Sequence, residues 1–533
     1  MARNGRYITF QVSGERVTGV LGSNAQAFVR DLSTGLTTLV SADATGQPCF
    51  RGAFAAGCSS NGRYVLFLSE DANIIVPDIN QAMDAFVRDA TTNATERVSE
   101  NSFGIQAGGV QDARISGDGR WVALTSHDAY LVSGDTNGQE DVFLKDRATG
   151  GMTRVSLGVA GNELGYSNFP PQYGGAIGMI DINDDGRFVV FETWAINASP
   201  LDANSWRDVY LHDVASGTSE YISVDAAGQG SQLGGESPAL SGDGRFVAFA
   251  SRSPNIVAGI APSVPQVYVR DRATGVAELI SVDANGQPGN GLTLPPFAVS
   301  TDGRFVAFAS YATNFASGDT NAVPDVFLRD RLLGSTRCVS VTSNGSLYFS
   351  SQGSRVAGLS DDGTKVMFDT AAGVLVPGDS NASWDAFVRD LSWPAPPISA
   401  YCIGKSSSNG CIPTIATAGA PDTAGSSAFF VTSTRAPNHR VGALVWSLAP
   451  AAPPYFAGSL CVAAPAHMLV RQDSNGHAGA GTDCSGWYSY AMTPALMSAN
   501  AWTPGTTVYA QFFVRNPGTS NLALSQGLSF TVW

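Results

Sequence analysis

A turn-and-strand pattern that recurs along the chain limits its possible folds more than any other sequence feature. In the copy at Ser241–Ser251, an Asp-Gly dipeptide is followed by residues that alternate between the two faces of a strand. Asp-Gly favours a tight turn because glycine readily adopts a positive φ, and alternation is typical of a β-strand. Near-copies place the turn glycine at Gly5, Gly62, Gly119, Gly186, Gly244, Gly303 and Gly363. These glycines lie 57 to 67 residues apart, which predicts seven repeat units.

Each unit contains four short strand-like segments. One follows the turn, a second ends in Asp as in Phe86–Asp89, and a third ends in Ser as in Arg97–Ser99. A fourth, such as Ala113–Ser116, precedes the next turn. Four short strands per unit without helical periodicity predict an all-β, seven-bladed β-propeller over residues 1–392. A solenoid is the alternative, but a four-stranded meander favours radial closure, which protects the sheet edges.

The turn of the fifth unit, Ser241-Gly-Asp-Gly-Arg245, with its apolar strand and a second strand ending at Asp271, resembles the TolB-like propeller repeat of bacteria. The resemblance covers residues 1–392 and implies the propeller fold. TolB-like propellers are mostly binding or scaffold modules, so it implies little about activity.

The first and last units are incomplete. The first has no strand-like segment before its Asn4-Gly5 turn, and the seventh has none after Asp390. We therefore expect one blade without its innermost strand and a neighbouring blade without its outermost strand.

The composition changes after a Pro-rich linker at residues 393–397. Residues 398–533 carry five basic and three acidic side chains and include apolar stretches such as Val508–Val514 and Leu528–Trp533. They predict a C-terminal β-sandwich, immunoglobulin-like or jelly-roll. The Cys-x8-Cys opening at Cys402 and the Asp483-Cys-Ser-Gly motif are similar to C-terminal modules of secreted bacterial proteins.

The cysteines and the charge bear on location and partners. Three close cysteine pairs without histidine neighbours favour disulfides over zinc, and buried thiols are the alternative. Disulfides indicate an extracellular, cell-surface or periplasmic protein. No signal core precedes the first repeat, so either a leader was removed or the chain begins inside a longer product. A net charge of −14 without a Lys/Arg run argues against nucleic acid, and no apolar run approaches a membrane span. The pairs are Cys49/Cys58, Cys402/Cys411 and Cys461/Cys484, which leaves Cys338 alone.

An Asp-x-Asn-x-x-x-Asp pattern lies between the strand after the turn and the next strand in five units. Alternating oxygen ligands closed by a carboxylate suit Ca²⁺. The alternative is that these side chains cap turns through their own backbone. The first unit keeps only Asn24, and the fifth has Ala261–Gln266 instead. The candidate ligands are Asp78, Asn80, Asp84, Asp135, Asn137, Asp141, Asp202, Asn204, Asp208, Asp319, Asn321, Asp325, Asp379, Asn381 and Asp385.

The same loops, together with the connections between blades, belong to one face of the predicted disc. An insertion at residues 161–175 also belongs there, and variable loops on a rigid scaffold are where binding residues concentrate. Aromatic side chains there either stack on sugar rings or pack the edges between blades. The candidate ligand-binding residues are Tyr166, Phe169, Tyr173, Trp206 and Trp384.

No motif for catalysis is present. The five histidines have no metal-ligand spacing, and no Gly-x-Ser-x-Gly elbow occurs. The sequence therefore favours a non-enzymatic binding or structural protein with a protein or glycan ligand on the loop face, and with self-assembly through the C-terminal domain as a further possibility. The alternative is an extracellular polysaccharide lyase or hydrolase that uses the same face.

Overall fold

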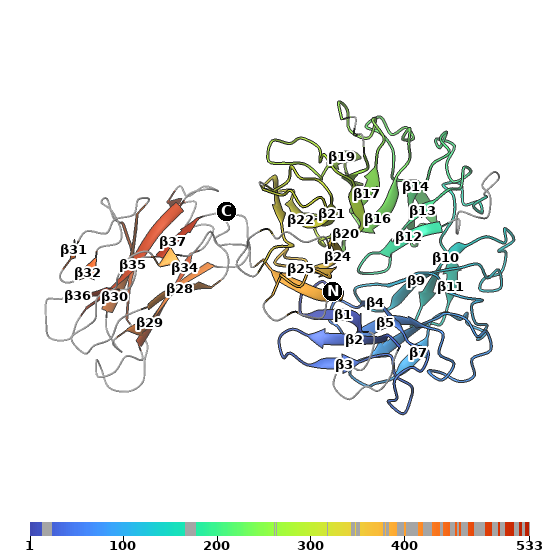
Figure 1. Cartoon of the computed structure of the whole chain (residues 1–533), viewed down its shortest axis with the longest axis horizontal. Helices are drawn as coiled ribbons and strands as arrows, with labels where there is room; N and C mark the ends of the chain where they lie inside the picture. The colour runs from blue at the N-terminus through green and yellow to red at the C-terminus, as the bar shows by residue number, and fades with distance from the viewer. Residues whose placement is uncertain are drawn as a thin grey trace. The chain divides into compact units, whose positions relative to one another are not determined.

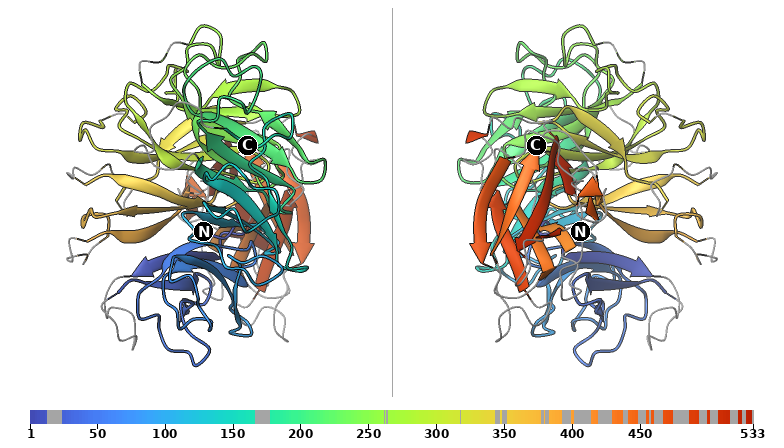
Figure 2. Two further views of the ribbon diagram at one scale, coloured as in Figure 1. Left: turned by 90° about the vertical axis from the view of Figure 1, so that its right-hand side faces the viewer. Right: turned by 90° about the vertical axis from the view of Figure 1, so that its left-hand side faces the viewer.

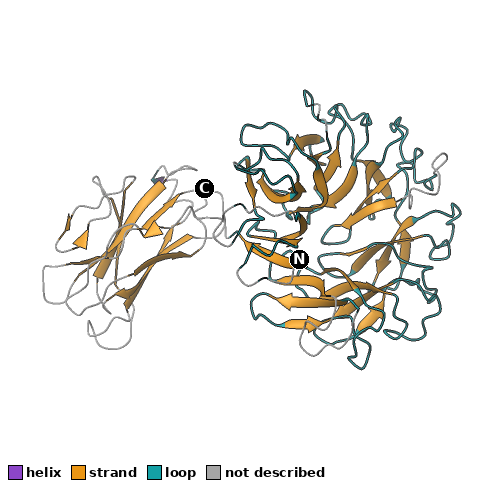
Figure 3. Cartoon of the chain, in the orientation of Figure 1, coloured by secondary structure: helices purple, strands orange, loops and turns teal. Residues whose placement is uncertain are grey.

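The computed structural model divides the chain into two compact units, Met1–Leu391 and Ser392–Trp533. In the first unit it describes all residues except 13–23, 166–176, 261, 263, 317, 343–346, 348–351, 377–378 and 380–382. In the second it describes the backbone of the strands and residues 499–500. Every element bounded in these residues is a β-strand (Figure 3). No described helix is long and apolar enough to cross a membrane.

The first unit is a seven-bladed β-propeller, as predicted, and its sheets are arranged around a common axis (Figures 1 and 2). Blades 2 to 6 are four-stranded antiparallel meanders. Blade 1 is β1 (Tyr7–Val12), β2 (Gln26–Asp31) and β3 (Thr37–Leu39); blade 2 is β4 (Phe54–Cys58), β5 (Tyr64–Ser69), β6 (Asp84–Asp89) and β7 (Thr95–Arg97). Blade 3 is β8 (Ala113–Ile115), β9 (Trp121–Ser126), β10 (Asp141–Asp146) and β11 (Met152–Arg154); blade 4 is β12 (Ile177–Ile182), β13 (Phe188–Thr193), β14 (Asp208–Asp213) and β15 (Thr218–Tyr221). Blade 5 is β16 (Glu236–Leu240), β17 (Phe246–Ser251), β18 (Gln266–Asp271) and β19 (Val276–Leu279); blade 6 is β20 (Thr293–Val299), β21 (Phe305–Ser310), β22 (Asp325–Asp330) and β23 (Ser335–Cys338); blade 7 is β24 (Ser354–Leu359), β25 (Lys365–Thr370) and β26 (Asp385–Asp390).

The incomplete blades are the two that the sequence predicts. In the described residues, blade 1 lacks an innermost strand and blade 7 lacks an outermost strand. The Asp-Gly turns join the first two strands of a blade at one end of the meander. We call this end of the disc the turn face and the opposite end, which carries the Asp/Asn loops and the connections between blades, the loop face.

In blades 2 to 7, the turn glycine contacts the aromatic ring that begins the second strand of the preceding blade. Gly62 has a φ of +71°, and a Cβ on it would overlap the ring of Tyr7. The same relation joins Gly119 to Tyr64 and Gly186 to Trp121, and it recurs at Gly244, Gly303 and Gly363. Glycine is therefore required here both for its backbone conformation and for the room it leaves.

An ion pair joins the turn to the third strand in blades 1 to 6. In blade 5, the Arg245 guanidinium donates from Nε and Nη2 to the two carboxylate oxygens of Asp271 and also stacks on the ring of Phe246. The Asp that ends the third strand thus has a structural role in each of these six blades. The six pairs, with closest N–O distances of 2.6 to 2.8 Å, are Arg6–Asp31, Arg63–Asp89, Arg120–Asp146, Arg187–Asp213, Arg245–Asp271 and Arg304–Asp330.

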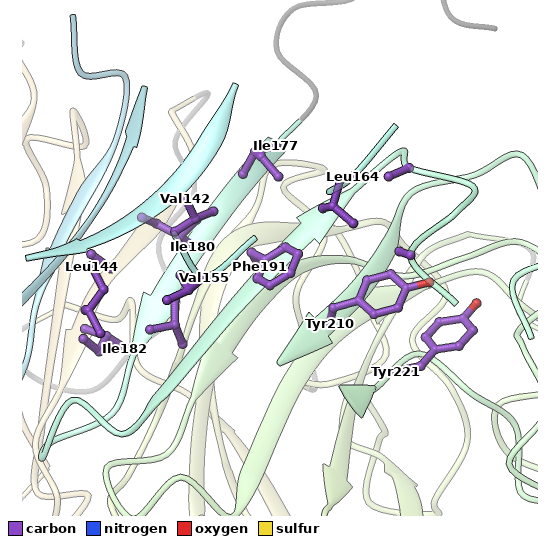
Figure 4. Packing of buried hydrophobic residues seen from close by; sticks show 14 of the residues in the cluster. Val142, Leu144, Val155, Leu164, Ile177, Ile180, Ile182, Phe191, Tyr210 and Tyr221 are labelled. Carbon is purple, nitrogen blue, oxygen red and sulfur yellow. The ribbon is translucent and has the colours of Figure 1, made fainter. Parts of the chain in front are cut away.

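Apolar side chains from facing sheets fill the spaces between blades. Between blades 3 and 4, Val142 and Leu144 pack with Ile180, Phe191 and Tyr210 in one buried cluster (Figure 4). Middle strands such as β9 and β10 contribute to the clusters on both of their faces, so they read as nearly continuous apolar runs.

The ring closes through backbone hydrogen bonds at the turn face and through one arginine. Asp361 N–H of blade 7 donates to the Arg3 carbonyl at 2.8 Å. The Arg3 guanidinium donates to the carbonyls of Val299 and Leu240 at 3.0 and 3.2 Å and lies 2.6 Å from the Asp184 carboxylate. One side chain that precedes blade 1 therefore contacts blades 4, 5 and 6 around the axis.

The first predicted disulfide is wrong. Cys49 and Cys58 are free thiols in this structure. Cys49 lies in the connection before strand β4, and Cys58 is the last residue of that strand. A strand advances about 3.3 Å per residue, so β4 carries Cys58 about 13 Å from Phe54, where the connection with Cys49 enters the strand, whereas a disulfide needs Cα atoms within about 7 Å. Cys338 is also free, and the pairs Cys402/Cys411 and Cys461/Cys484 lie outside the described residues.

The second unit contains paired strands throughout its described residues. Its largest sheet has the order β27-β37-β35-β30-β33 with β36 paired to β35, and a second sheet has the order β28-β29-β34. The predicted linker, 393–397, lies outside the described residues. The strands are β27 (Ser399–Ala400), β28 (Thr414–Ala418), β29 (Phe429–Ala436), β30 (Val441–Ser447), β31 (Pro454–Tyr455), β32 (Gly458–Ser459), β33 (His467–Asp473), β34 (Gly486–Met492), β35 (Thr507–Arg515), β36 (Leu522–Leu524) and β37 (Leu528–Thr531).

Substitution of Arg3 tests the closure of the ring. We expect Arg3→Ala to lower the free energy of unfolding by about 2 kcal/mol, because it removes charge-assisted hydrogen bonds and leaves Asp184 without its cation. Urea unfolding with far-UV circular dichroism measures the change. Arg51→Ala, which removes an exposed arginine, is the control, and equal effects of the two substitutions would contradict the role of Arg3.

Candidate functional site

The last residue of the Asp/Asn pattern begins the third strand of its blade and lies in a buried polar network. In blade 2, the Ser99 hydroxyl donates to Asp84 Oδ1 at 2.6 Å and accepts the Ala85 N–H. Asn80 Nδ2 donates to Asp84 Oδ1 at 3.1 Å and to the Ala107 carbonyl at 2.7 Å. The network thus ties three segments of the blade together at the loop face.

Blades 1 and 5 build the same network from a glutamine. Gln266 Oε1 accepts the hydroxyl of Ser281 at 2.6 Å, and Gln266 Nε2 donates to the Gly289 carbonyl at 3.0 Å. Gln26 makes the corresponding bonds to Ser41 and Cys49 in blade 1. One glutamine therefore supplies both the acceptor and the amide donor that an Asp and an Asn supply together elsewhere. This replacement explains why the pattern is missing from two units.

The side chain two positions before the network serine differs between blades, and an arginine occurs there only in blades 2 and 3, where the acceptor is an aspartate. Blades 1 and 5 combine the neutral glutamine with Leu39 and Leu279. In blade 2, Arg97 Nε lies 3.1 Å from Asp84 Oδ2, and Arg154 takes the same place in blade 3. In blade 4 the position is Tyr221, and no arginine faces Asp208 among the described contacts. Burial raises the pKa of Asp208 to about 7 and that of Asp325, beside Cys338 in blade 6, to about 6.

The calcium hypothesis for these loops stays a prediction. In blades 2, 3, 4 and 6 the asparagine directs its amide nitrogen, a donor, at the closing carboxylate. Among the described residues no three His, Cys, Asp or Glu side chains are grouped to hold a metal ion. This geometry favours the capping alternative. In blade 7 Asn381 lies outside the described residues.

Replacement of the Asp/Asn pair of blade 4 by the single glutamine that blades 1 and 5 have at this position tests the network. We expect the variant Asn204→Ala/Asp208→Gln to fold and to be more stable than the parent at pH 8, because a raised carboxyl pKa costs stability once the group ionises. The stability that neutral Asp208 contributes is complete below about pH 4 and is lost as the pH rises towards about 7, so the parent should lose on the order of 2 kcal/mol relative to the variant between pH 5 and pH 8.

Urea unfolding at several pH values measures this difference. Asp84→Gln is the matched comparison and should destabilise the protein by about 3 kcal/mol, because Arg97 is buried and would lose its carboxylate. If the free energies of unfolding of the parent and the double variant changed equally with pH, this would contradict the role assigned to Asp208 in the network.

A calcium titration tests the loops independently. Since an asparagine amide already donates to the closing carboxylate in blades 2, 3, 4 and 6, we expect the melting temperature to be the same in a chelator and in millimolar Ca²⁺. Binding heat in calorimetry together with a rise in melting temperature would instead place the ion in these loops.

The two predicted aromatic residues that the structure describes lie on different blades. Trp206 and Trp384 lie on the loop face of blades 4 and 7, where Arg252 and Arg355 stack on them at 5.1 and 4.5 Å. Both indoles therefore pack on an arginine of a neighbouring segment while remaining partly exposed. Tyr166, Phe169 and Tyr173 lie outside the described residues.

A cavity of about 1190 Å³ opens on the loop face between blades 2 and 3. One wall is the hairpin of the connection after blade 2, with Phe103 and Ile105, and the other is the loop after β9, with His127 and Tyr130. Phe103 and Tyr130 are 88% and 77% exposed, which is unusual for large apolar side chains. Asn101 Nδ2 donates to the Tyr130 carbonyl at 3.2 Å and fixes the two walls relative to each other.

Two consecutive glycines leave space for this cavity. Gly108 and Gly109 follow Ala107, and both line the cavity. The corresponding connection after blade 1 has Phe50 and Arg51, whose backbone N–H groups donate to Asp71 of blade 2. Without side chains at this point, the connection and the next blade do not fill the gap between them.

The cavity is acidic. Asp128 and Asp135 line it, and none of its described lining residues is Lys or Arg. The guanidinium of Arg154 lies 3.2 Å from Asp135 and also pairs with Asp141 and Glu163. Burial, countered by Arg154, raises the pKa of Asp135.

Sequence reasoning missed this cavity although a signal was present. Phe103 and Ile105 stand where the connection after blade 5 has Asn285 and Gln287. Tyr130 likewise replaces the asparagine that other units have, as at Asn73. Comparison of the units position by position at their polar loops, rather than a search for insertions, would have found these departures.

No family model matches the chain, and no curated protein matches it. Solved propellers resemble its fold. An oligogalacturonate lyase from Vibrio parahaemolyticus is 11% identical with a TM-score of 0.43, over 73% of this chain and 88% of that one. A putative TolB from Agrobacterium tumefaciens is 17% identical with a TM-score of 0.34, over 68% and 96%. The β-propeller domain of the trilobed protease from Pyrococcus furiosus is 11% identical with a TM-score of 0.41, over 73% and 93%.

Proposed function

We propose that the propeller is a non-enzymatic binding scaffold that holds an extended segment of a partner protein in the cavity between blades 2 and 3. The observation that carries this proposal is the exposure of Phe103 and Tyr130 on opposite walls of an open cavity. Ile105, Leu131 and Met152 add an aliphatic lining, which suits amino-acid side chains better than the hydroxyl-rich faces of sugars. A glycan stacked between the two rings is the second ligand class.

The remaining parts of the proposal concern location and assembly. A secreted or cell-surface protein of the TolB-like type fits the acidic, turn-rich sequence. We propose that the second unit is a β-sandwich and that the apolar strand Leu528–Thr531 contributes to an extracellular assembly. Light scattering of the whole protein at high concentration tests this part, and a strict monomer would remove it.

An enzyme is the alternative from another class. His127 and Tyr130 in the cavity are side chains that polysaccharide lyases or hydrolases use as acids and bases, and their blade is the only described one that carries both at these loop positions. Turnover of a panel of polysaccharides, with His127→Ala as the inactive comparison, tests this alternative.

Loss of the exposed rings tests the binding proposal. The protein is applied in parallel to an array of random decapeptides and to a glycan array, and we expect it to bind a subset of the peptides. Phe103→Ala and Tyr130→Ala should each weaken that binding tenfold or more, because burial of an aromatic side chain contributes about 1.5–3 kcal/mol. Phe50→Ala, which removes an equally exposed phenylalanine after blade 1, is the control. Binding to neither array, or binding that Phe103→Ala leaves intact, would overturn the proposal.

A further inference from the structure

We infer that the cavity between blades 2 and 3 selects a basic side chain, lysine or arginine, of the partner segment. This inference rests on the proposed function and names the chemistry of its ligand. It follows from one carboxylate that is free to bind, from the charge around it, and from the apolar walls that lead to it.

Asp128 has a carboxylate oxygen that the protein does not use. Its Oδ1 accepts the Tyr130 N–H at 2.8 Å, whereas no hydrogen bond is made to its Oδ2 among the described residues. In blade 2 the corresponding Oδ2, that of Asp71, accepts the N–H groups of Phe50 and Arg51. The Oδ2 of Asp128 in blade 3 is therefore available as an acceptor at the cavity, whereas the Oδ2 of Asp71 in blade 2 is occupied by backbone N–H groups of the protein.

The charge near Asp128 is not balanced by the protein. The side chain of Asp135 is 2% exposed, and it shares the guanidinium of Arg154 with Asp141 and Glu163. Asp128 adds a fourth carboxylate to the three that pair with Arg154, and it takes part in none of the described ion pairs. His127 and Tyr130 are the other titratable side chains among the described residues that line the cavity. An anionic side chain or a uronic acid would be repelled here, and a cation would be attracted.

The apolar walls suit the stem of such a side chain. Lysine and arginine carry three or four methylene groups before their charge, and they pack these stems along apolar surface. Phe103, Tyr130 and Met152 line the cavity together with Asp128. A cation above either exposed ring also gains from the ring quadrupole. A basic side chain therefore matches both the surface and the charge of the cavity.

The test uses the best-binding decapeptide of the array and variants in which each basic residue is replaced by norleucine, which keeps an alkyl stem without charge. Fluorescence anisotropy with the whole protein should show a tenfold or greater loss of affinity for the norleucine peptide. Asp128→Asn keeps the acceptor for the Tyr130 N–H. We expect it to lower the affinity for the basic peptide about tenfold and to leave the affinity for the norleucine peptide unchanged. Glu70→Gln, which removes an exposed carboxylate elsewhere on the loop face, should change neither affinity.

A second variant does not depend on Asp128. Ser102→Lys adds a cation at the exposed rim of the cavity and should lower the affinity for the basic peptide only. Equal binding of basic and norleucine peptides, with loss of both in Phe103→Ala, would overturn the inference and leave the proposed function standing. Absence of binding to any peptide would overturn both.

Discussion

The contact between a turn glycine and the aromatic ring of the preceding blade is the interaction on which the propeller depends. At Gly62, Gly186 and Gly303 alike, the glycine has a positive φ and would overlap its neighbour's ring if it carried a Cβ. Because, in blades 2 to 6, the arginine after the glycine pairs with the third strand and stacks on the aromatic ring of its own blade, each of these turns fixes its blade internally and against the preceding one. The junction between blades 7 and 1 departs from this rule, since Lys365 stands in place of the ring and Arg3 closes the axis instead.

The loop face is governed by a second requirement, the satisfaction of buried polar groups. Every network needs an acceptor for a buried serine hydroxyl and an amide donor for a backbone carbonyl, since an unpaired buried group is costly. An Asp with an Asn meets this need in blade 2, and Gln266 alone meets it in blade 5. The charge of the aspartate then requires a further partner, which Arg97 provides and Tyr221 does not. Stability and pH sensitivity are thereby distributed unevenly around a ring that looks uniform in sequence.

Sequence reasoning reached the seven blades and the two incomplete ones because turn chemistry and strand alternation act over a few residues. It failed at Cys49 and Cys58, which are close in sequence but separated by a strand. It also looked for binding at the insertion and at Trp206 and Trp384, whereas the described cavity lies between blades 2 and 3. That cavity depends on Gly108 and Gly109, whose effect appears only when two blades face each other.

The sequence by itself determined the number of blades, the order of their strands and the end of each blade where variable loops gather. These properties follow from glycine conformation and from side-chain alternation, both of which are local. Only the tertiary structure decided which loops oppose each other across a blade boundary, because that depends on contacts between residues far apart in the chain. It placed Phe103 and Tyr130 in the lining of one cavity and left Asp128 with an oxygen that accepts no hydrogen bond among the described residues, and these positions give the loop face an open, acidic cavity.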